Sequence, residues 1–264
     1  MPGILSMSND STVKTFVVAG GLCLICSIIV SGAAVGLRPK QEANKALDKQ
    51  KNVLEVVGRY EAGMNIGEEF ATFEPRLVDL NTGKYVAGDA AAFDQRAASK
   101  DSAQSTVIPA KDDIAKIKRR PNNAQVFLAK NETGGVQYYI LPISGYGLWS
   151  TMRGYLALES DARTVKGIIF YEQAETPGLG GEIANPAWRA LWAGKLVYDE
   201  NFQQRLTVVK GQAARTGQQA NYEVDGLAGA TLTTRGVANL IEYWMGGNGF
   251  KKYLENVKSN NAKS

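Results

Sequence analysis

The sequence predicts an α+β protein, with one N-terminal transmembrane helix followed by a single domain in which helices flank an antiparallel sheet. Three observations predict it. Residues 15–37 carry no charge. Several segments rich in aromatic and β-branched residues then follow with short turns between them, and the chain ends in two segments with helical periodicity. Strands followed by helices favour an α+β domain over a doubly wound one. We expect an N-terminal segment at 1–14, a transmembrane helix at 15–37, and one domain with a stalk helix at 38–264.

The uncharged segment at 15–37 is long enough to cross a membrane. As a helix it would span roughly 34 Å, and it exceeds the roughly 7–15 apolar residues of a signal peptide. Lys14 precedes it, and five basic residues follow between 38 and 51. This asymmetry by itself would hold the domain in the cytoplasm, although long domains translocate largely regardless of charge.

The soluble part divides into a stalk helix, a mixed region, a run of strands and two C-terminal helices. Apolar periodicity predicts the stalk helix at 41–57 and a short charged helix at 111–120. A turn at 81–83 predicts a hairpin from the flanking segments 77–80 and 84–86. Further strands are expected at 126–129, 136–143, 155–158, 165–171 and 206–210. The final helices are expected around 237–245 and 250–257.

The composition excludes several kinds of chemistry. The chain has 264 residues, no histidine, two cysteines and a net charge of +4. A Ser-His-Asp triad, a zinc site with imidazole ligands and a haem with axial histidine therefore cannot form. Two cysteines are too few for a four-cysteine metal site, and no dense basic stripe indicates nucleic-acid binding. We therefore predict no catalytic residue and no metal site in this chain, and no nucleic-acid partner.

Two glycine-rich loops are the candidate binding elements. The first, at 175–182, has the sequence ETPGLGGE, and its glycines and proline fix a tight backbone with exposed amides. By itself it is equally typical of an ordinary turn. The second, at 225–234, reads DGLAGATLTT and leads into the first C-terminal helix. Glycines and hydroxyls at a helix start suit either a phosphate or a simple N-cap, and capping is the more common use. Neither loop has the Walker or dinucleotide-binding spacing.

Taken together, these motifs identify a family. The anchor, the ETPGLGGE loop, the NPAWR segment at 185–189 and the 225–231 segment resemble the C subunit of the Na⁺-translocating NADH:quinone reductase, a family related to the G subunit of the Rnf complex. The 225–231 segment resembles the family's flavinylation signature, in which the threonine of Gly-Ala-Thr carries FMN through a phosphoester bond. That threonine is Thr231. Ala228 stands where the signature has Ser or Thr, which removes a hydroxyl worth about 1 kcal/mol as a hydrogen-bonding group.

The resemblance implies a role for each site residue. Thr231 would carry covalent FMN, and the domain at 38–264 would be an FMN-binding domain. A flavin transferase would install FMN from FAD with Mg²⁺, so this chain needs no base of its own. The phosphate would lie at the helix start, near the amides of 232–234. The expected recognition residues are Asp225, Gly229 and Ala230; those at the helix start are Leu232, Thr233, Thr234 and Arg235; those near the flavin ring are Glu175, Thr176, Gly178 and Leu179, with Trp149 or Tyr146 stacking.

The implied function is electron relay within a membrane complex. The chain would pass single electrons between partner subunits of a Na⁺-translocating NADH:quinone reductase. It would be anchored once in a bacterial inner membrane with the domain on the periplasmic side. The alternative, from the residues alone, is a membrane-anchored module that binds a ligand or partner non-covalently. In that interpretation the 225–234 segment is only a helix cap. A free-standing hydrolase ranks third, because no triad is available.

Overall fold

The computed structural model describes residues 11–261, so most of the predicted N-terminal segment at 1–14 lies outside the described residues. The chain divides into a first unit that ends at Lys49 and a second unit, Gln50–Ser264. The elements in chain order are α1 (Thr12–Val56), α2 (Ile66–Phe70), β1 (Phe73–Asp79), β2 (Lys84–Val86), α3 (Gln95–Lys100), β3 (Ser105–Val107), β4 (Arg119–Pro121), β5 (Asn123–Lys130), β6 (Val136–Tyr146), β7 (Thr151–Glu159), β8 (Val165–Glu172), the 3₁₀ helix η2 (Gly180–Ala184), α4 (Pro186–Ala190), β9 (Thr207–Val208), η3 (Gln218–Asn221), β10 (Glu223–Val224), α5 (Thr231–Met245) and α6 (Lys251–Asn261).

Helix α1 is the one helix among residues 11–261 that is long and apolar enough to cross a membrane, judged by length and composition. The sequence predicted a transmembrane helix and a separate stalk helix on either side of Pro39. The structure instead has one helix that continues through Pro39. A proline removes one backbone hydrogen bond and crowds the preceding turn, but it does not always end a helix.

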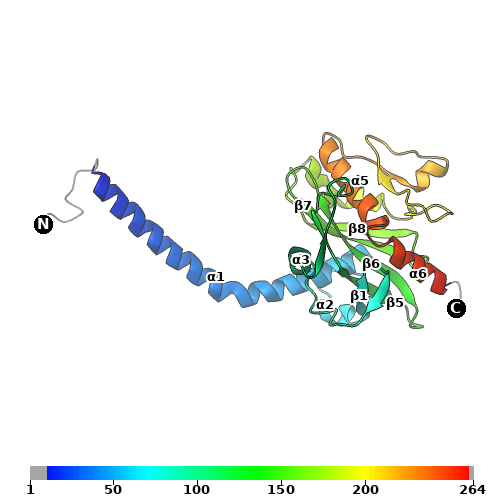
Figure 1. Ribbon diagram of the computed structural model, residues 1–264, viewed down its shortest axis with the longest axis horizontal. Helices are drawn as coiled ribbons and strands as arrows, with labels where there is room; N and C mark the ends of the chain where they lie inside the picture. Colours follow the sequence, from blue (N-terminus) through cyan, green and yellow to red (C-terminus); the bar gives the residue numbers. More distant parts are fainter. Residues whose placement is uncertain (1–10, 262–264) are drawn as a thin grey trace. The chain divides into compact units, whose positions relative to one another are not determined.

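A six-stranded antiparallel sheet forms the centre of the second unit, in the order β2-β1-β5-β6-β7-β8. Both faces are buried, because side chains alternate between two apolar clusters along each central strand. On β6, for example, Tyr139, Leu141 and Ile143 belong to the cluster under α5 and α6, whereas Tyr138 and Ile140 belong to the other. Figure 1 shows α5 and α6 crossing one face of the sheet. The end of α1, through Val53, Leu54 and Val56, packs in the cluster on the opposite face. The predicted α+β fold is confirmed.

Apart from α1, the local differences from the sequence-based expectations concern short elements. The hairpin at 77–86 and both C-terminal helices form where they were predicted, and the strand expected at 206–210 shortens to β9. The helix expected at 111–120 is wrong. Both carboxylate oxygens of Asp113 accept backbone hydrogen bonds, from Ile117 at 2.9 Å and Lys118 at 2.8 Å, and so hold a turn. Lys116 and Lys118 have positive φ, and the chain then enters β4.

Candidate functional site

The first turn of α5 is where the two glycine-rich loops meet. Glu175, in the first loop, is 4 % exposed, and its carboxylate binds groups from two other segments. Thr233 of α5 donates its hydroxyl to Oε2 of Glu175 at 2.5 Å. The backbone amides of Leu148, Trp149 and Ser150 also donate to this carboxylate, at 3.0–3.2 Å. One buried side chain therefore joins the 175–182 loop, the segment after β6, and α5.

Three glycines allow this close approach. A β-carbon on Gly147 would lie 2.5 Å from Oε1 of Glu175. One on Gly180 would lie 3.0 Å from Cβ of Glu175 and would collide with the hydroxyl of Thr233. One on Gly236, in the second turn of α5, would lie 2.7 Å from the carbonyl oxygen of Tyr146. Because real β-carbons do not approach other atoms so closely, each of these positions requires glycine or a local shift.

The Glu175 carboxylate is ionised in this setting. Burial by itself would raise its pKa. The hydrogen bonds from Thr233 and from the amides of Trp149, Leu148 and Ser150 favour the charged form and lower the pKa below its ordinary value. All these donors belong to the domain itself, so Glu175 serves to hold the loop in place.

The second loop is held by Asp225. Its Oδ1 accepts the backbone amide of Ala213 at 2.8 Å, and its Oδ2 pairs with Arg215 at 2.7 Å. The indole of Trp188 donates to its carbonyl oxygen at 2.8 Å. Burial raises the pKa of Asp225, but the amide of Ala213 and the Arg215 guanidinium outweigh burial, so the pKa lies below its ordinary value. Asp225 thus ties the 213–215 segment to the start of the loop that leads to α5.

Three threonines lie at the start of α5, and their hydroxyls differ. Thr233 and Thr234 are buried, at 1 % and 5 % exposed. The hydroxyl of Thr233 is bound to Glu175, and that of Thr234 accepts the amide of Leu227 at 3.0 Å. Thr231 is exposed, and it is the first residue of the helix. Among the three, Thr231 is the one exposed residue.

The backbone at this helix start leaves donors unused. Ala230 occupies the N-cap position and makes no side-chain capping bond. The amide of Thr234 is already part of the helix, because it donates to the carbonyl of Ala230 at 2.9 Å. This corrects the expectation that the amide of Thr234 is free for a phosphate. The amides of the preceding residues, Leu232 and Thr233, belong to the first turn, where a helix has no internal acceptors.

Exposed apolar side chains lie on the segments that meet at the start of α5. Trp149, Leu232 and Leu179 are 65 %, 52 % and 43 % exposed, and Tyr146 and Leu148 are exposed as well. The indole of Trp149 donates to the hydroxyl of Thr176 at 3.2 Å, which holds the ring over the 175–182 loop. A β-carbon on Gly229, whose φ is +72°, would approach Cδ2 of Leu179 to 3.0 Å, so Leu179 lies against the second loop. We call these five side chains the apolar rim.

The structure brings most of the predicted site residues together, in unequal roles. Thr176 and Leu179 lie at the rim, and Gly178 is exposed with a φ of +75°. Glu175 and Thr233 lie beneath it and bind each other. Sequence reasoning missed the amides of 148–150, and it missed Gly147 and Arg215; the glycine directly before Leu148 and Trp149 was the one available signal. Among residues 11–261 no group of three or more cysteine or carboxylate side chains is placed to hold a metal ion.

Sequence comparisons find close relatives over nearly the whole chain. The FMN-binding domain family matches residues 147–246, which run from Gly147 to the end of α5. The C subunit of the Na(+)-translocating NADH-quinone reductase of Vibrio vulnificus strain YJ016 is 51 % identical over 252 residues, covering 95 % of this chain and 97 % of that one. The protein of the same name from Pseudomonas aeruginosa is 45 % identical over 260 residues, covering 97 % and 99 %.

Solved structures give a consistent result. The crystal structure of Shewanella oneidensis NqrC matches with a TM-score of 0.75 and 36 % identity, covering 82 % of this chain and 99 % of that one. The crystal structure of the C subunit of the Na(+)-translocating NADH-quinone reductase from Parabacteroides distasonis matches with a TM-score of 0.63 and 28 % identity, covering 84 % and 96 %.

Proposed function

Because this chain belongs to the family formed by the C subunits of Na⁺-translocating NADH-quinone reductases, we propose that it is an electron-transfer subunit of such a complex and carries FMN on Thr231 through a phosphoester bond. The observation that carries the attachment site is the difference among the three threonines. The hydroxyls of Thr233 and Thr234 are buried and bound within the domain, whereas Thr231 is exposed at the helix start. Of these three threonines, a transferase working on the folded chain can reach Thr231, whereas the hydroxyls of Thr233 and Thr234 are held inside the domain.

The surroundings of Thr231 suit both halves of FMN. A phosphate ester on its oxygen lies where the first-turn amides of α5 and the positive end of the helix dipole favour negative charge. Arg235, exposed one turn further on, adds a positive charge. The apolar rim offers Trp149, Leu179 and Leu232 to a planar, largely apolar ring. When bound, FMN supplies the redox chemistry, and the chain supplies position and local polarity.

The attachment reaction balances without a base from this chain. We infer that a flavin transferase uses FAD as donor: the Thr231 oxygen bonds to the phosphorus of the FMN half, the pyrophosphate bond breaks, and AMP leaves. The hydroxyl proton goes to the transferase or to solvent. In the same proposal the transferase recognises Asp225, Gly229 and Ala230, which precede Thr231 in the second loop.

The partners follow from the family. We propose that the other subunits of the reductase supply and receive the electrons, one at a time, and that α1 anchors the chain in the bacterial inner membrane. The domain is then periplasmic and the N-terminus cytoplasmic. A reporter enzyme fused after Ser264 tests this: it is expected to be active only as a periplasmic type. Activity only of a cytoplasmic reporter would refute the orientation.

The attachment is tested by changing one hydroxyl. Thr231→Val, made with the transferase co-expressed, is expected to lose all flavin fluorescence on a denaturing gel, because no ester can form. Thr231→Ser keeps a hydroxyl at the same place and is expected to retain fluorescence. Peptide mapping of the wild-type chain by mass spectrometry should place the added mass on the peptide that contains Thr231. Persistent fluorescence in Thr231→Val would refute this site.

Non-covalent binding predicts a different result. If the loops only hold a ligand, the purified chain loses its yellow colour when it is denatured and gel-filtered. The covalent proposal expects the colour to stay with the polypeptide.

A further inference from the structure

A surface cavity lies at the end of α5 opposite to Thr231. Its volume is about 220 Å³, and its lining includes Asn81, Thr106, Asp112, Arg120, Tyr243 and Lys252. These residues come from the β1–β2 turn, the segment from β3 to β4, and the region where α5 ends and α6 begins. Thr231 and Tyr243 are twelve residues apart on one helix, which places them about 18 Å from each other along its axis. The cavity is therefore separate from the apolar rim.

The lining residue Arg120 carries a positive charge that is buried. It is 8 % exposed, so its guanidinium is buried. One terminal nitrogen donates to the carbonyl oxygen of Asn248 at 2.6 Å, and the other donates to the side-chain oxygen of Asn81. Its Nε is shielded from solvent and has no hydrogen-bond partner among the described residues. In the described part of the chain no carboxylate forms an ion pair with the guanidinium within 4.0 Å, and Asp79 interacts with it electrostatically without such a contact.

Two acidic residues on neighbouring elements, Asp79 and Asp113, bind backbone amides directly. The carboxylate of Asp79 accepts the amides of Asn81 and Thr82, both at 2.8 Å. That of Asp113 accepts the amides of Ile117 and Lys118. Asp112 lines the cavity and is the one acidic side chain that faces it. A buried cation without a paired anion is costly, because it has lost water without gaining a counter-charge.

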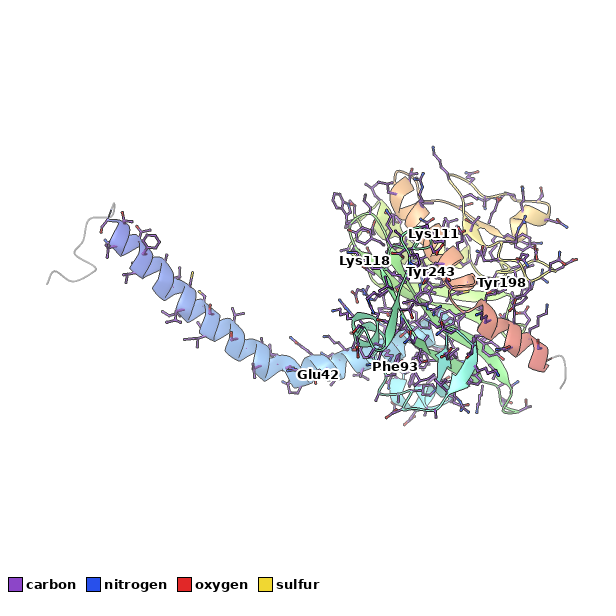
Figure 2. The ribbon with its side chains drawn as sticks, viewed as in Figure 1. Glu42, Phe93, Lys111, Lys118, Tyr198 and Tyr243 are labelled. Atoms are coloured by element: carbon purple, nitrogen blue, oxygen red, sulfur yellow. The ribbon has the colours of Figure 1, made fainter. Side chains whose placement is uncertain are left out.

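Other groups around the cavity favour an anion. Lys252 lines the cavity, and its Nζ donates to the carbonyl oxygen of Asn81 at 2.8 Å. Lys111 precedes the lining residue Asp112 in the chain, and the carbonyl oxygen of Lys118 accepts the amide of the lining residue Ile108 at 3.0 Å; Figure 2 labels both lysines and Tyr243. Burial raises the pKa of Tyr243 to about 12, so its phenol stays protonated and able to donate a hydrogen bond.

We propose that this cavity binds a small oxyanion, a phosphate or a carboxylate, as the counter-ion of Arg120. The ammonium group of Lys252 adds a second positive charge to that of Arg120, and the hydroxyls of Thr106 and Tyr243 supply hydrogen-bond donors. At roughly 30 Å³ per water molecule, the cavity of about 220 Å³ holds about seven waters, which suits a phosphate or a short carboxylic acid. Asp112 opposes an anion, but the basic side chains outnumber it. The bound anion links α5, α6, β4 and the β1–β2 turn.

The probe is inorganic phosphate, added to the purified full-length chain in detergent at constant ionic strength with chloride as the balancing ion. Phosphate several times above its Kd is expected to raise Tm by about 2–4 °C, because the ligand binds only the folded chain. Broadening of the phosphorus-31 resonance on adding protein reports the same binding directly. Acetate in place of phosphate tells whether a carboxylate is also accepted.

Matched lysine variants test the location. Lys252→Gln removes a cavity charge from an exposed side chain and is expected to weaken phosphate binding at least about tenfold. Lys251→Gln removes the same charge one residue away, outside the lining, and is expected to keep the binding. Arg120→Gln should abolish binding; because this variant removes a buried group and risks misfolding, the lysine pair is the deciding comparison. Equal Tm in phosphate, acetate and chloride, or equal loss in both lysine variants, would overturn the proposal.

Discussion

The two loops that meet at the start of α5 are each held by one carboxylate, but in different ways. Glu175 is buried and joins three segments that are far apart in the sequence. Asp225 holds the nearby 213–215 segment; its side chain is 20 % exposed, and that of its partner Arg215 is 61 % exposed. The 175–182 loop is therefore part of the interior framework, whereas the 225–231 loop is fixed mainly at the surface. The difference teaches that a motif residue can serve the fold or the ligand, and that burial separates the two.

The largest effect on stability is expected from removing the buried carboxylate of Glu175. Glu175→Ala leaves the hydroxyl of Thr233 and three amides without their acceptor, and we expect the unfolding free energy to fall by about 3–5 kcal/mol. Urea unfolding followed by tryptophan fluorescence measures it. Glu132→Ala, at an exposed hairpin position, is the control and should change little. A loss below about 1 kcal/mol for Glu175→Ala would contradict the framework role.

Two glycines of the 175–182 loop test whether crowding around Glu175 and Thr233 matters for stability. A β-carbon at Gly180 would collide with the hydroxyl of Thr233, so Gly180→Ala should destabilise by about 1–3 kcal/mol through overpacking. Gly178 has a φ of +75° but no atom within 4 Å of a built β-carbon. Gly178→Ala should therefore cost only the backbone strain, about 1 kcal/mol. The same unfolding measurement compares them, and equal losses would show that crowding at Thr233 is unimportant.

The more exposed carboxylate, that of Asp225, should matter less for stability and more for flavin loading. Asp225→Asn keeps an acceptor for the amide of Ala213 but loses the ion pair with Arg215, which is worth about 0.5–1 kcal/mol at an exposed site. Arg215→Gln loses the same ion pair and keeps the carboxylate. If the transferase recognises Asp225, in-gel flavin fluorescence falls at least about fivefold in Asp225→Asn, the equivalent of about 1 kcal/mol, and stays near wild type in Arg215→Gln. Equal loading in the two variants argues against recognition.

The smallest effect is a pH dependence. The folded-state pKa of Glu175 lies below its ordinary value of 4.5, so its stabilising contribution is complete above pH 4.5 and is lost as the pH falls through the folded pKa. The stability gap between wild type and Glu175→Gln should be constant above that pH and narrow below it. For Asp225→Asn the narrowing should begin lower, below 3.8. A gap for Glu175→Gln that widens on acidification would reverse the assigned sign.

Features with a local periodic signal were predictable from the sequence. Val237, Leu240, Ile241 and Trp244 repeat at helical spacing, and all four are buried in α5. The β-branched and aromatic segments likewise became β5 to β8. Apolar periodicity gave a wrong prediction where a side chain accepts hydrogen bonds from the backbone amides. The apolar pair Ile114 and Ile117 favoured a helix, but the carboxylate of Asp113 takes the amides that a helix would use.

The candidate site shows the same limit. The two loops could be found from their sequences, because a glycine-rich segment before a helix has a local signature, whereas Thr231 is singled out only by the resemblance to the family's flavinylation signature. The partnership of Glu175 with Thr233 could not, because the two are 58 positions apart and only the packing of α5 on the sheet brings them together. The sequence accordingly suggested a ring-side position for Glu175, whereas its oxygens face the amides of 148–150 inside the domain. That it also contacts the ring stays a prediction.

The exposed hydroxyl of Thr231 has a consequence for the order of events in the cell. Neighbouring threonines give their hydroxyls to the hydrogen-bonded interior, and α5 begins without a side-chain cap from Ala230. Under the proposed attachment, the hydroxyl that receives FMN is not one that holds the fold together, so the chain can complete its core before the cofactor arrives. If a transferase attaches FMN at Thr231 as proposed, the cofactor-free protein is a folded precursor, and the supply of electron carriers depends on how fast the transferase works.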